Sequence, residues 1–522
     1  MILLLLVVVT ALAQVTDKIR IPYPILLVLV GMGIGLFPSL PVVELDPEVV
    51  FLIFLPPVLY AAAWTTSWPD FKAAKRPITL LAIGCVLFTT TMVAVIAHYF
   101  IPNFGWAESF VFGAIISPPD AVAATAATRG LTLPKRIVTI LEGESLVNDA
   151  TGLIAYRYAI GATATGTFIW WLATANFVYV AGVGIIIGLL LGVLVLWIHK
   201  ITPDNATTDT TFTFLTPYAA YLIAEAFHTS GVLAVVTCGL YTSWNSSEIF
   251  SHSTRLQAYA VWDTIIFILN GIIFILIGLQ LPLILKNLEE HSLFTLISYG
   301  AIVSVATIVV RIIWVYPGSY LPRILSKKVR EREPRPSMKM VSIVAWSGMR
   351  GVVSLAAALA LPLMVSENVP FPNRDLVIFL TFSVIFTTLV LQGLTLPALV
   401  KWAGVKGDDT EHRAEQEARH RIAVSVIEHI EENYSLSLSD EVLNQVKSKY
   451  ELRVQRLQKD NNQRKLSEEQ LNELHRIQQE LLKMERQFIL ALRKNRKISD
   501  ESLRKIEHEL DLEESRLALD GH

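Results

Sequence analysis

The chain has 522 residues, of which 53% are hydrophobic and 17% are charged, and apolar runs of about 20 residues recur along it. This composition excludes an ordinary water-soluble domain, and a formal net charge of −2 gives no electrostatic reason to expect a nucleic-acid partner. The sequence has no Walker-type glycine loop, so we expect neither a nucleotide cofactor nor ATP-driven transport.

The polar content changes sharply near residue 400. Residues 1–400 are overwhelmingly apolar, whereas 401–522 are dense in Glu, Lys, Arg and Gln. We therefore predict an all-α polytopic membrane domain over 1–400, followed by a soluble helical tail over 401–522. In the tail, apolar residues recur at helical spacing and predict a small amphipathic bundle; they include Leu471, Leu474, Ile477, Leu481 and Met484.

Thirteen apolar segments are long enough to cross a bilayer as helices. They fall at about 1–16, 22–38, 48–64, 78–100, 107–127, 136–160, 167–198, 211–228, 230–245, 257–281, 291–320, 339–363 and 375–400. The first is short, and its Ala11-Leu12-Ala13 imitates a signal-peptide cleavage site. We expect it to be retained as a helix, because cleavage would leave Lys18 and Arg20 on the side of the membrane that is poor in basic residues.

Basic residues gather in alternate loops between these segments. The intervening loops, such as 42–48 and 101–108, are poor in them, whereas the run from 323 to 339 is dense in Lys and Arg. By the positive-inside rule the basic loops are cytoplasmic, so we expect the N-terminus outside and the tail in the cytoplasm. The expected location is a bacterial plasma (inner) membrane.

Two of the predicted helices carry interruptions. The segment 107–127 contains Ser117-Pro118-Pro119-Asp120, whose two prolines each remove a backbone donor. The segment 339–363 contains WSGMRGVVS (346–354), in which two glycines flank Arg350. These are the fifth and twelfth segments, which run in opposite directions. Matched interruptions favour a transporter built from inverted repeats, about 1–160 and 211–400, joined by the helix at about 167–198, with its site near the midplane.

Charged residues inside the membrane cost about 2.5–3.5 kcal/mol each at the bilayer centre, so they indicate a cavity or a partner. In the segment 136–160, Glu144 and Asn148 are i,i+4 neighbours, and so are Ser145 and Asp149. Arg350 keeps its proton and needs an anionic partner, so we predict that Glu144 with Asn148 supplies it. Secondary candidates for intramembrane roles are Glu225 and Arg311.

Asp149 is then the carboxylate that remains free. Because removal from water makes a carboxylate hold a proton more tightly, it can bind a proton or a cation near neutral pH, but not both together. Ser145, Ser117 and carbonyls released at the broken helix are expected to complete an oxygen shell for a monovalent cation. Asp120 is expected to balance the exposed helix-terminal dipoles. Two mutually exclusive ligands on one carboxylate are sufficient for antiport.

Six stretches, in this order along the chain, resemble the monovalent cation:proton antiporter family, which contains bacterial sodium/proton antiporters and animal sodium/proton exchangers. They are FLPPVLY (54–60), SPPDAVA (117–123), EGESLVNDATGL (142–153), AYLIAEAFHTSGVLAVVTCGL (220–240), RIIWVYP (311–317) and GMRGVVSLAAALALP (348–362). The resemblance implies thirteen helices in a dimerisation domain and a mobile core domain, elevator-like movement and a homodimer.

The resemblance also implies roles for individual residues. Asp149 matches the essential ion- and proton-binding aspartate, and Asn148 matches the asparagine associated with electroneutral exchange. Glu144 and Arg350 resemble the family's charged pair, Ser145 resembles an ion ligand, and Asp120 matches the aspartate at the crossover of the fifth helix.

Two departures from the family pattern concern the ion shell. The family commonly reads Thr-Asp-Pro at the crossover, where this chain has Pro119-Asp120-Ala121. The stretch LYAAAW (59–64) lacks the acidic residue that some relatives place after the LPP motif. The choice between Na⁺ and K⁺ is therefore open.

From these residues we predict electroneutral exchange of a monovalent cation, Na⁺ in the first place, for H⁺. A K⁺-preferring antiporter is the alternative within the class. An ion channel would need a continuous polar pathway, which one dominant titratable carboxylate argues against. An intramembrane hydrolase would need a nucleophile with a base, and no membrane histidine is positioned to help Ser145.

Overall fold

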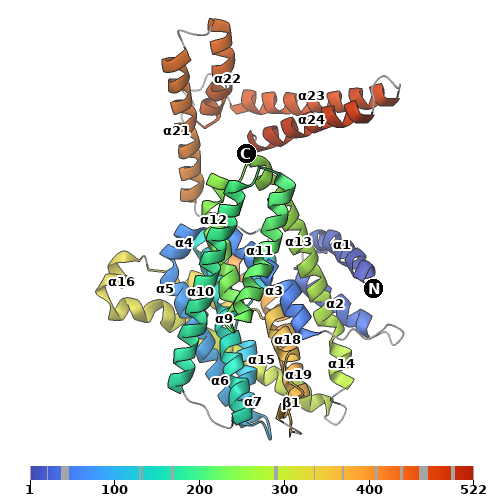
Figure 1. Ribbon diagram of the computed structural model, residues 1–522, viewed down its shortest axis with the longest axis vertical. Helices are drawn as coiled ribbons and strands as arrows, with labels where there is room; N and C mark the ends of the chain where they lie inside the picture. Colours follow the sequence, from blue (N-terminus) through green and yellow to red (C-terminus); the bar gives the residue numbers. More distant parts are fainter. Residues whose placement is uncertain are drawn as a thin grey trace. The chain divides into compact units, whose positions relative to one another are not determined.

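The computed structural model describes residues 2–19, 22–36, 46–128, 131, 133–165, 170–286, 288, 292–333, 335–366, 369–405, 409–434, 439–457, 468–494 and 500–520. The chain forms two compact units, Met1–Gly407 and Asp408–His522 (Figure 1).

The first unit is built almost entirely from helices. Its first half contains α1 (Ile2–Ile19), α2 (Tyr23–Gly35), α3 (Pro47–Thr65), α4 (Trp68–Ala73), α5 (Lys75–Thr79), the π-helical turn η1 (Leu80–Cys85), α6 (Val86–Phe100), α7 (Trp106–Ile116), α8 (Ala121–Ala127), α9 (Lys135–Thr165) and α10 (Trp170–Ile201). Its second half contains α11 (Ala206–Ala226), α12 (Gly231–Ile249), α13 (His252–Leu279), α14 (Leu281–Lys286), α15 (Leu293–Leu325), α16 (Lys327–Arg332), α17 (Met338–Trp346), α18 (Val352–Leu359), the antiparallel strands β1 (Met364–Ser366) and β2 (Val369–Pro370), α19 (Arg374–Thr387), the π-helical turn η2 (Thr388–Gln392) and α20 (Gly393–Ala403).

The predicted apolar segments coincide with helices, but the number of membrane crossings stays a prediction. By length and composition, six helices in the described part of the chain can cross a membrane, or seven if the bent pair α7 and α8 forms one span. The protein is therefore a multi-pass membrane protein. The helix α9 is long enough to cross, yet it carries Glu142, Glu144, Asp149 and Arg157 and is too polar to be recognised by composition.

Both predicted helix interruptions are confirmed. The helices α7 and α8 are bent by 43° at residues 117–120, where Pro118 and Pro119 have no N–H to donate. Asp120 begins the second piece, because its side chain accepts a hydrogen bond from the Val122 N–H at 2.8 Å. The second interruption separates α17 from α18 at residues 347–351.

The two interruptions cross each other in the middle of the unit. The Asp120 N–H donates a hydrogen bond of 2.7 Å to the Met349 carbonyl, which joins one broken helix to the other. A Cβ atom added at Gly351 would overlap the Asp120 carboxylate. The close approach of these two segments of the chain therefore requires glycine at position 351.

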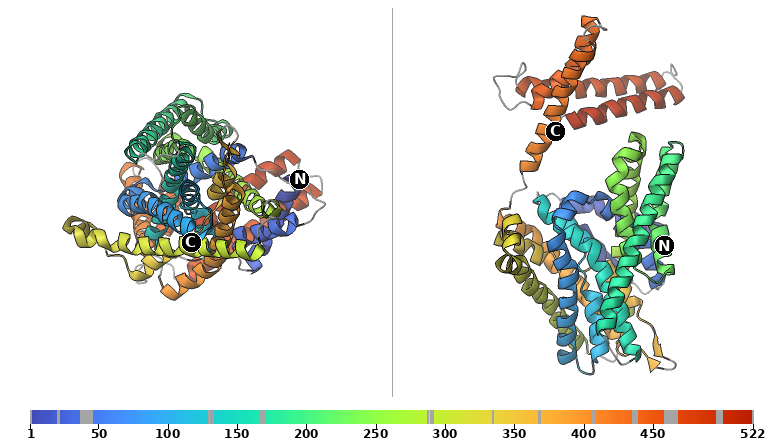
Figure 2. Two further views of the ribbon diagram at one scale, coloured as in Figure 1. Left: turned by 90° about the horizontal axis from the view of Figure 1, so that it is seen from below. Right: turned by 60° about the vertical axis from the view of Figure 1, so that its left-hand side comes forward.

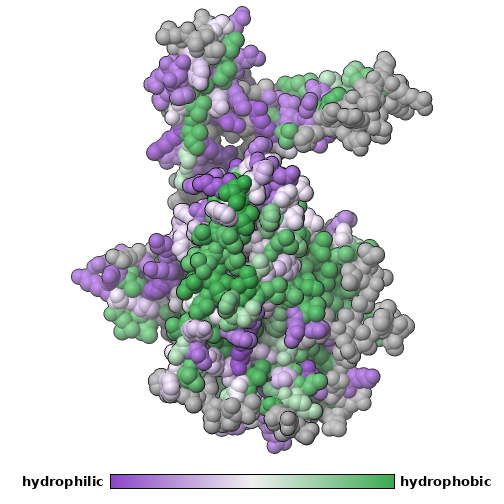
Figure 3. Space-filling view, in the orientation of Figure 1, coloured by the Kyte–Doolittle hydropathy of each residue, from purple (hydrophilic) through white to green (hydrophobic). Residues whose placement is uncertain are grey.

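The helix α10 shows how the unit meets its surroundings. One face of α10 packs closely on α12, with Gly184 and Gly188 against the backbone of Ser230 and Ala234; small residues four apart are typical of such helix contacts in membranes. The helix runs along the outside of the unit (Figure 2), and only 22% of its apolar span is buried. Apolar side chains gather over this face (Figure 3), which indicates contact with lipid or another protein surface.

The second unit is a pair of helical hairpins, with α21 (Asp409–Tyr434) beside α22 (Asp440–Leu457) and α23 (Glu468–Lys494) beside α24 (Asp500–Asp520) (Figure 2). The core between α23 and α24 is formed by Leu482, Ile489 and Leu510.

The predicted apolar stripe of the tail does not lie in its core. Ile477, Leu481 and Met484 are 43%, 48% and 58% exposed. In the described part of the tail, α23 packs on α24 and buries the stripe that carries Leu482 and Ile489 instead. The side chains of Leu471 and Leu474 lie outside the described residues.

We predict that Gly351→Ala destabilises the first unit. The added methyl group must displace Asp120 from the crossing, and such overpacking typically costs about 1–3 kcal/mol. The measurement is the thermal unfolding of purified protein in detergent. Gly182→Ala on α10 is the matched control, since nothing lies within 4 Å of its added Cβ. Equal melting temperatures for the two variants would contradict the crossing geometry.

Candidate functional site

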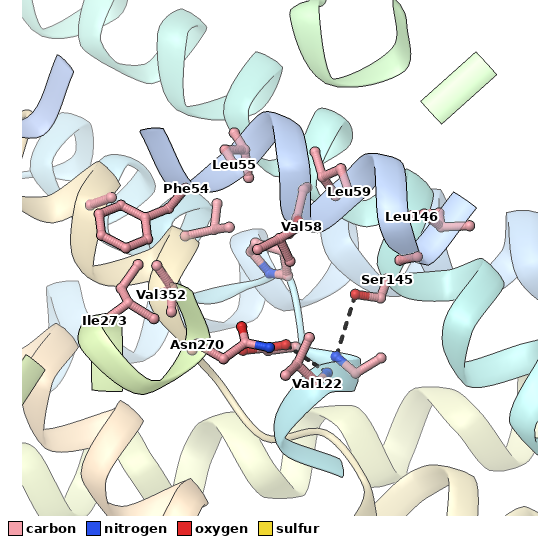
Figure 4. A pocket seen from close by; sticks show the side chains of 18 of the residues that line it. Phe54, Leu55, Val58, Leu59, Val122, Ser145, Leu146, Asn270, Ile273 and Val352 are labelled. Carbon is pink, nitrogen blue, oxygen red and sulfur yellow. Dashed lines mark hydrogen bonds between the residues drawn. The ribbon is translucent and has the colours of Figure 1, made fainter. Parts of the chain in front are cut away.

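A cavity of about 160 Å³ lies beside the crossing of the two broken helices. One wall is apolar and comes from α3, whose Phe54, Leu55, Val58 and Leu59 line it (Figure 4). Most of the polar lining lies away from this wall and is contributed by the two interruptions, α8, α9, α13 and α18. The polar side chains that line the cavity are Thr65, Asp120, Thr125, Glu142, Ser145, Asp149, Asn270 and Ser354.

Asp149 is the central group of this polar side. Its residue is 7% exposed and its carboxylate borders the cavity. Within the described ranges, no donor forms a hydrogen bond or an ion pair with it. Asp120 is close enough for its charge to act on Asp149. The site therefore holds two neighbouring carboxylates, one of which has all of its ligand positions open.

Ser145 and Asn148 attach α9 to the first interruption. The Ser145 hydroxyl oxygen accepts a hydrogen bond of 3.3 Å from the Ala121 N–H, one of the free donors at the start of α8 (Figure 4). The Asn148 side chain donates a hydrogen bond of 2.7 Å to the Pro119 carbonyl. Both contacts satisfy backbone groups that the interruption releases. Together they fix the position of α9, and with it that of Asp149, relative to the interruption.

The predicted pair of Glu144 with Arg350 is wrong. Glu144 instead forms two hydrogen bonds with Arg311 of α15, at 2.6 and 2.9 Å, and Arg311 also donates to the Val344 carbonyl at 3.1 Å. Both side chains are almost fully buried, at 1% and 2% exposure. Gly348 leaves the room that Arg311 occupies, because an added Cβ would overlap the Arg311 side chain.

Arg350 binds backbone carbonyls rather than a carboxylate. Its Nε donates a hydrogen bond of 2.6 Å to Ile116, the last residue of α7, and its Nη1 donates to Gly348. Its own N–H donates to the Thr388 hydroxyl at 3.1 Å. Arg350 therefore satisfies one carbonyl group left open where α7 ends and one in the second interruption, a role that the sequence prediction assigned to no residue.

Three further sequence predictions have different outcomes in the structure. Asn148 does not line the cavity and does not bind Arg350; its amide is used at Pro119. The Ser117 hydroxyl donates to the Ala114 carbonyl at 3.1 Å, and Ser117 is not among the cavity residues. Glu225 pairs with Arg157 at 2.7 Å on a partly exposed face, also away from the cavity.

The structure adds residues that the sequence prediction missed. Glu142, Ser145 and Asp149 are spaced i, i+3 and i+7, so they share one face of α9, and that spacing could have identified Glu142. Asn270 is an amide in the apolar stretch of α13 that follows Asp263, and the burial cost of an unpaired amide is the signal that could have identified it. The Ser354 hydroxyl is buried without a hydrogen-bond partner among the described residues.

The arrangement can bind a small hard cation or a proton. Carboxylate, hydroxyl and amide oxygens from Asp149, Asp120, Ser145 and Asn270 face one cavity, and oxygen donors are the ligands that hard cations prefer. Glu144, Arg311 and Arg350 already have partners. Asp149 is therefore the group in this set that is open to change its ligand.

Comparison with known proteins places the chain among membrane exchangers. Residues 3–402 match the family model described as "Sodium/hydrogen exchanger, transmembrane". The chain is 33% identical over 391 residues to a "Sodium, potassium, lithium and rubidium/H(+) antiporter" of Bacillus pumilus, an alignment that covers 73% of this chain and 58% of that protein. It is 31% identical to an uncharacterized Na⁺/H⁺ exchanger of Escherichia coli over 548 residues, covering 99% of this chain and 98% of that protein.

A solved structure has the same fold. The sodium proton antiporter of Methanocaldococcus jannaschii at pH 8 superposes with a TM-score of 0.60 and 20% sequence identity, covering 77% of this chain and 97% of that chain. At this identity the likeness concerns the fold alone.

We predict that the stability of the site depends on the pair of Glu144 with Arg311. Arg311→Met should lower the free energy of unfolding by about 3–5 kcal/mol, because it leaves Glu144 buried and unpaired. Adding Glu144→Gln should restore part of that loss. The measurement is a double-mutant cycle on thermal unfolding in detergent.

The control cycle combines Arg350→Met with Glu144→Gln, where we expect no restoration, since Arg350 binds carbonyl groups. If Glu144→Gln rescued the Arg350 variant and not the Arg311 variant, the observed pairing would be contradicted.

Proposed function

Because the chain belongs to the sodium/hydrogen exchanger family, we propose that it exchanges Na⁺, or another monovalent cation, for H⁺ by electroneutral antiport, the two ions competing for Asp149. The observation that supports this most is the unpaired Asp149 carboxylate beside the crossing of the two broken helices. Antiport needs a group that holds either ion and never both, and one open carboxylate meets that requirement.

The charges around Asp149 support coupling between the two ions. The charge of Glu144 is neutralised by Arg311. Asp120 caps the N-terminus of α8, and the partial positive charge of that helix end offsets part of the negative charge of Asp120. Asp149 is neutral when it holds a proton or a monovalent cation, and it carries an uncompensated charge when it is empty. Since an uncompensated charge inside the membrane is costly, movement of the loaded site is favoured over movement of the empty one.

The remaining polar groups position Asp149 and shape the ion shell. The contacts of Ser145 with Ala121 and of Asn148 with Pro119 tie α9 to the interruption, so α8 and Asp149 move as one body. We propose that Ser145 keeps one oxygen lone pair for the cation. Asp120 and Asn270 supply further oxygens from the other side of the cavity.

The cavity follows most of α3, from Val50 to Thr65. We propose that it opens at the end where Thr65 lies, and that this end is cytoplasmic. Thr65 ends α3, Thr125 lies near the end of α8, and Glu142 lies near the start of α9. A salt bridge of 3.0 Å between Asp70 and Lys135 joins the segments that follow α3 and precede α9, and the Lys135 ammonium holds the pKa of Asp70 below its usual range. These segments carry the basic residues that the positive-inside rule assigns to the cytoplasm, so this is the inward-facing form.

The choice of cation rests on the oxygen shell. The Bacillus pumilus relative is named as an antiporter of sodium, potassium, lithium and rubidium. In this chain the residue before Asp120 is Pro119, which has no side-chain hydroxyl to offer the cation. We propose Na⁺ as the main substrate, with K⁺ as the alternative that the same test decides.

We further propose that the protein acts as a homodimer in a bacterial plasma membrane, with the N-terminus outside and the tail in the cytoplasm. The exposed apolar face of α10 supports contact with lipid or with a second copy. The crossing of the two interruptions supports an elevator-like movement in which they travel together.

We predict that Asp149→Asn abolishes exchange, because the neutral amide takes up no proton near neutral pH and has no charge to balance a bound cation. The measurement is cation-driven proton flux into proteoliposomes that contain a pH dye, with Na⁺, K⁺, Li⁺ or Rb⁺ added in turn. Asp263→Asn, an exposed carboxylate on α13, is the matched control and should retain flux. Flux through the Asp149 variant equal to the wild-type flux would contradict the proposal that Asp149 binds the exchanged ions.

We predict that Glu142→Gln raises the apparent KM for the cation several-fold and leaves the maximal rate nearly unchanged. Glu142 lines the same cavity as Asp149 but nearer its entrance, so its charge acts by concentrating cations. The difference from wild type should shrink at high ionic strength, where charges are screened. Glu248→Gln, exposed at the end of α12, is the control. A KM that rises equally at low and high ionic strength would instead place Glu142 in the ion shell.

A further inference from the structure

Arginine side chains from separate helices meet one carboxylate outside the ion cavity. Arg76 of α5 holds both oxygens of Glu333, at 2.8 and 2.7 Å. Arg323 of α15 approaches Glu333 at 3.3 Å, and Arg136 of α9 approaches it at 3.7 Å. All three guanidinium groups face the Glu333 side chain, and Arg76 forms hydrogen bonds with both of its carboxylate oxygens.

The three arginines border a cleft of about 80 Å³, which is several times the roughly 10–15 Å³ that one water molecule needs. The cleft lies where α5, α9 and α17 begin and α15 ends, so it opens at one common end of the helices. The segments at this end carry the basic residues assigned above to the cytoplasm. Behind the arginines the wall is apolar, with Ile137, Ile140 and Val341.

The positive charge of the three arginines exceeds the negative charge of Glu333, the carboxylate that they share. The Arg76 Nη1 atom is buried and has no hydrogen-bond partner among the described residues. The Arg136 side chain is 42% exposed, and its ion pair with Glu333 is long, at 3.7 Å. An unpaired buried guanidinium donor is costly, so an anion in the cleft would satisfy Arg76 and Arg136 together.

We propose that this cleft binds a phosphate group, and that the source of the phosphate is an anionic membrane lipid. Planar guanidinium groups match phosphate oxygens by paired hydrogen bonds better than ammonium groups do. The apolar wall next to the arginines favours a lipid over a free anion, since it can take the first part of an acyl chain. Basic pockets between membrane helices on the cytoplasmic side are known to take such headgroups.

The bound lipid would join the helices that carry the buried charge pair. The cleft connects α9, which holds Glu144, with α15, which holds Arg311. A phosphate bridging Arg76 and Arg136 would hold the cytoplasmic ends of α5 and α9 together. The site does not depend on the exchange activity, so a failure of the proposed function leaves it unaffected.

The test is the shift in melting temperature of the purified full chain in detergent on adding phosphatidylglycerol, with phosphatidylcholine and inorganic phosphate as separate additions. Each variant is compared with its own value without addition, and dissociation constants are taken from the concentration dependence. Arg136→Gln should weaken phosphatidylglycerol binding by about fivefold, the effect of one basic residue near an anionic headgroup. Glu333→Gln should strengthen it, because it removes the carboxylate that competes for the arginines. Lys75→Gln, an exposed neighbour outside the cleft, should leave it unchanged.

Opposite shifts for the Arg136 and Glu333 variants, with phosphatidylcholine without effect, would establish the site. Equal stabilisation by both lipids, or shifts of the same sign in both variants, would overturn it. Binding of inorganic phosphate as tight as that of phosphatidylglycerol, with the same response to the variants, would keep the phosphate site and overturn the lipid as its source.

Discussion

Two helices that end inside an apolar unit release backbone donors and acceptors, and the site is built from the groups that satisfy them. Arg350 binds the carbonyl at the end of α7, Asn148 binds the Pro119 carbonyl, and Ser145 accepts from the first N–H of α8. The Asp120 N–H binds the second interruption at Met349. Each of these polar residues therefore has a structural reason to be inside the membrane, because an unsatisfied buried backbone group is expensive.

Asp149 is the exception that gives the arrangement its chemistry. It is buried beside the crossing with no partner among the described residues, while Glu144 is paired with Arg311 and Asp120 caps α8; Glu142, the third carboxylate of the cavity, is only half-buried. The rigid contacts of Ser145 and Asn148 hold it at the cavity. A fixed framework with one open carboxylate can exchange ligands without rearranging its other buried charges, and this is the physical basis of the proposed antiport.

Local chemistry in the sequence predicts the broken helices, because consecutive prolines and paired glycines act on the backbone where they stand. The spacing of Ser145 and Asp149 likewise places both on one face of α9, and they do line the cavity. The partner of Glu144 could not be predicted in this way. Two arginines were available, and only the packing of α15 against α17, with room left at Gly348, decides for Arg311. The same applies to the tail, where the packing of α24 decides which stripe of α23 is buried.

The most direct test of the central claim is the apparent KM for Na⁺ as a function of pH, measured by flux in proteoliposomes with the membrane potential clamped at zero. If one carboxylate serves both ions, KM should rise by about tenfold for each unit of falling pH on the acidic side, with the maximal rate unchanged. A KM independent of pH would contradict it, since cation and proton would then occupy separate groups and Asp149 could not couple them.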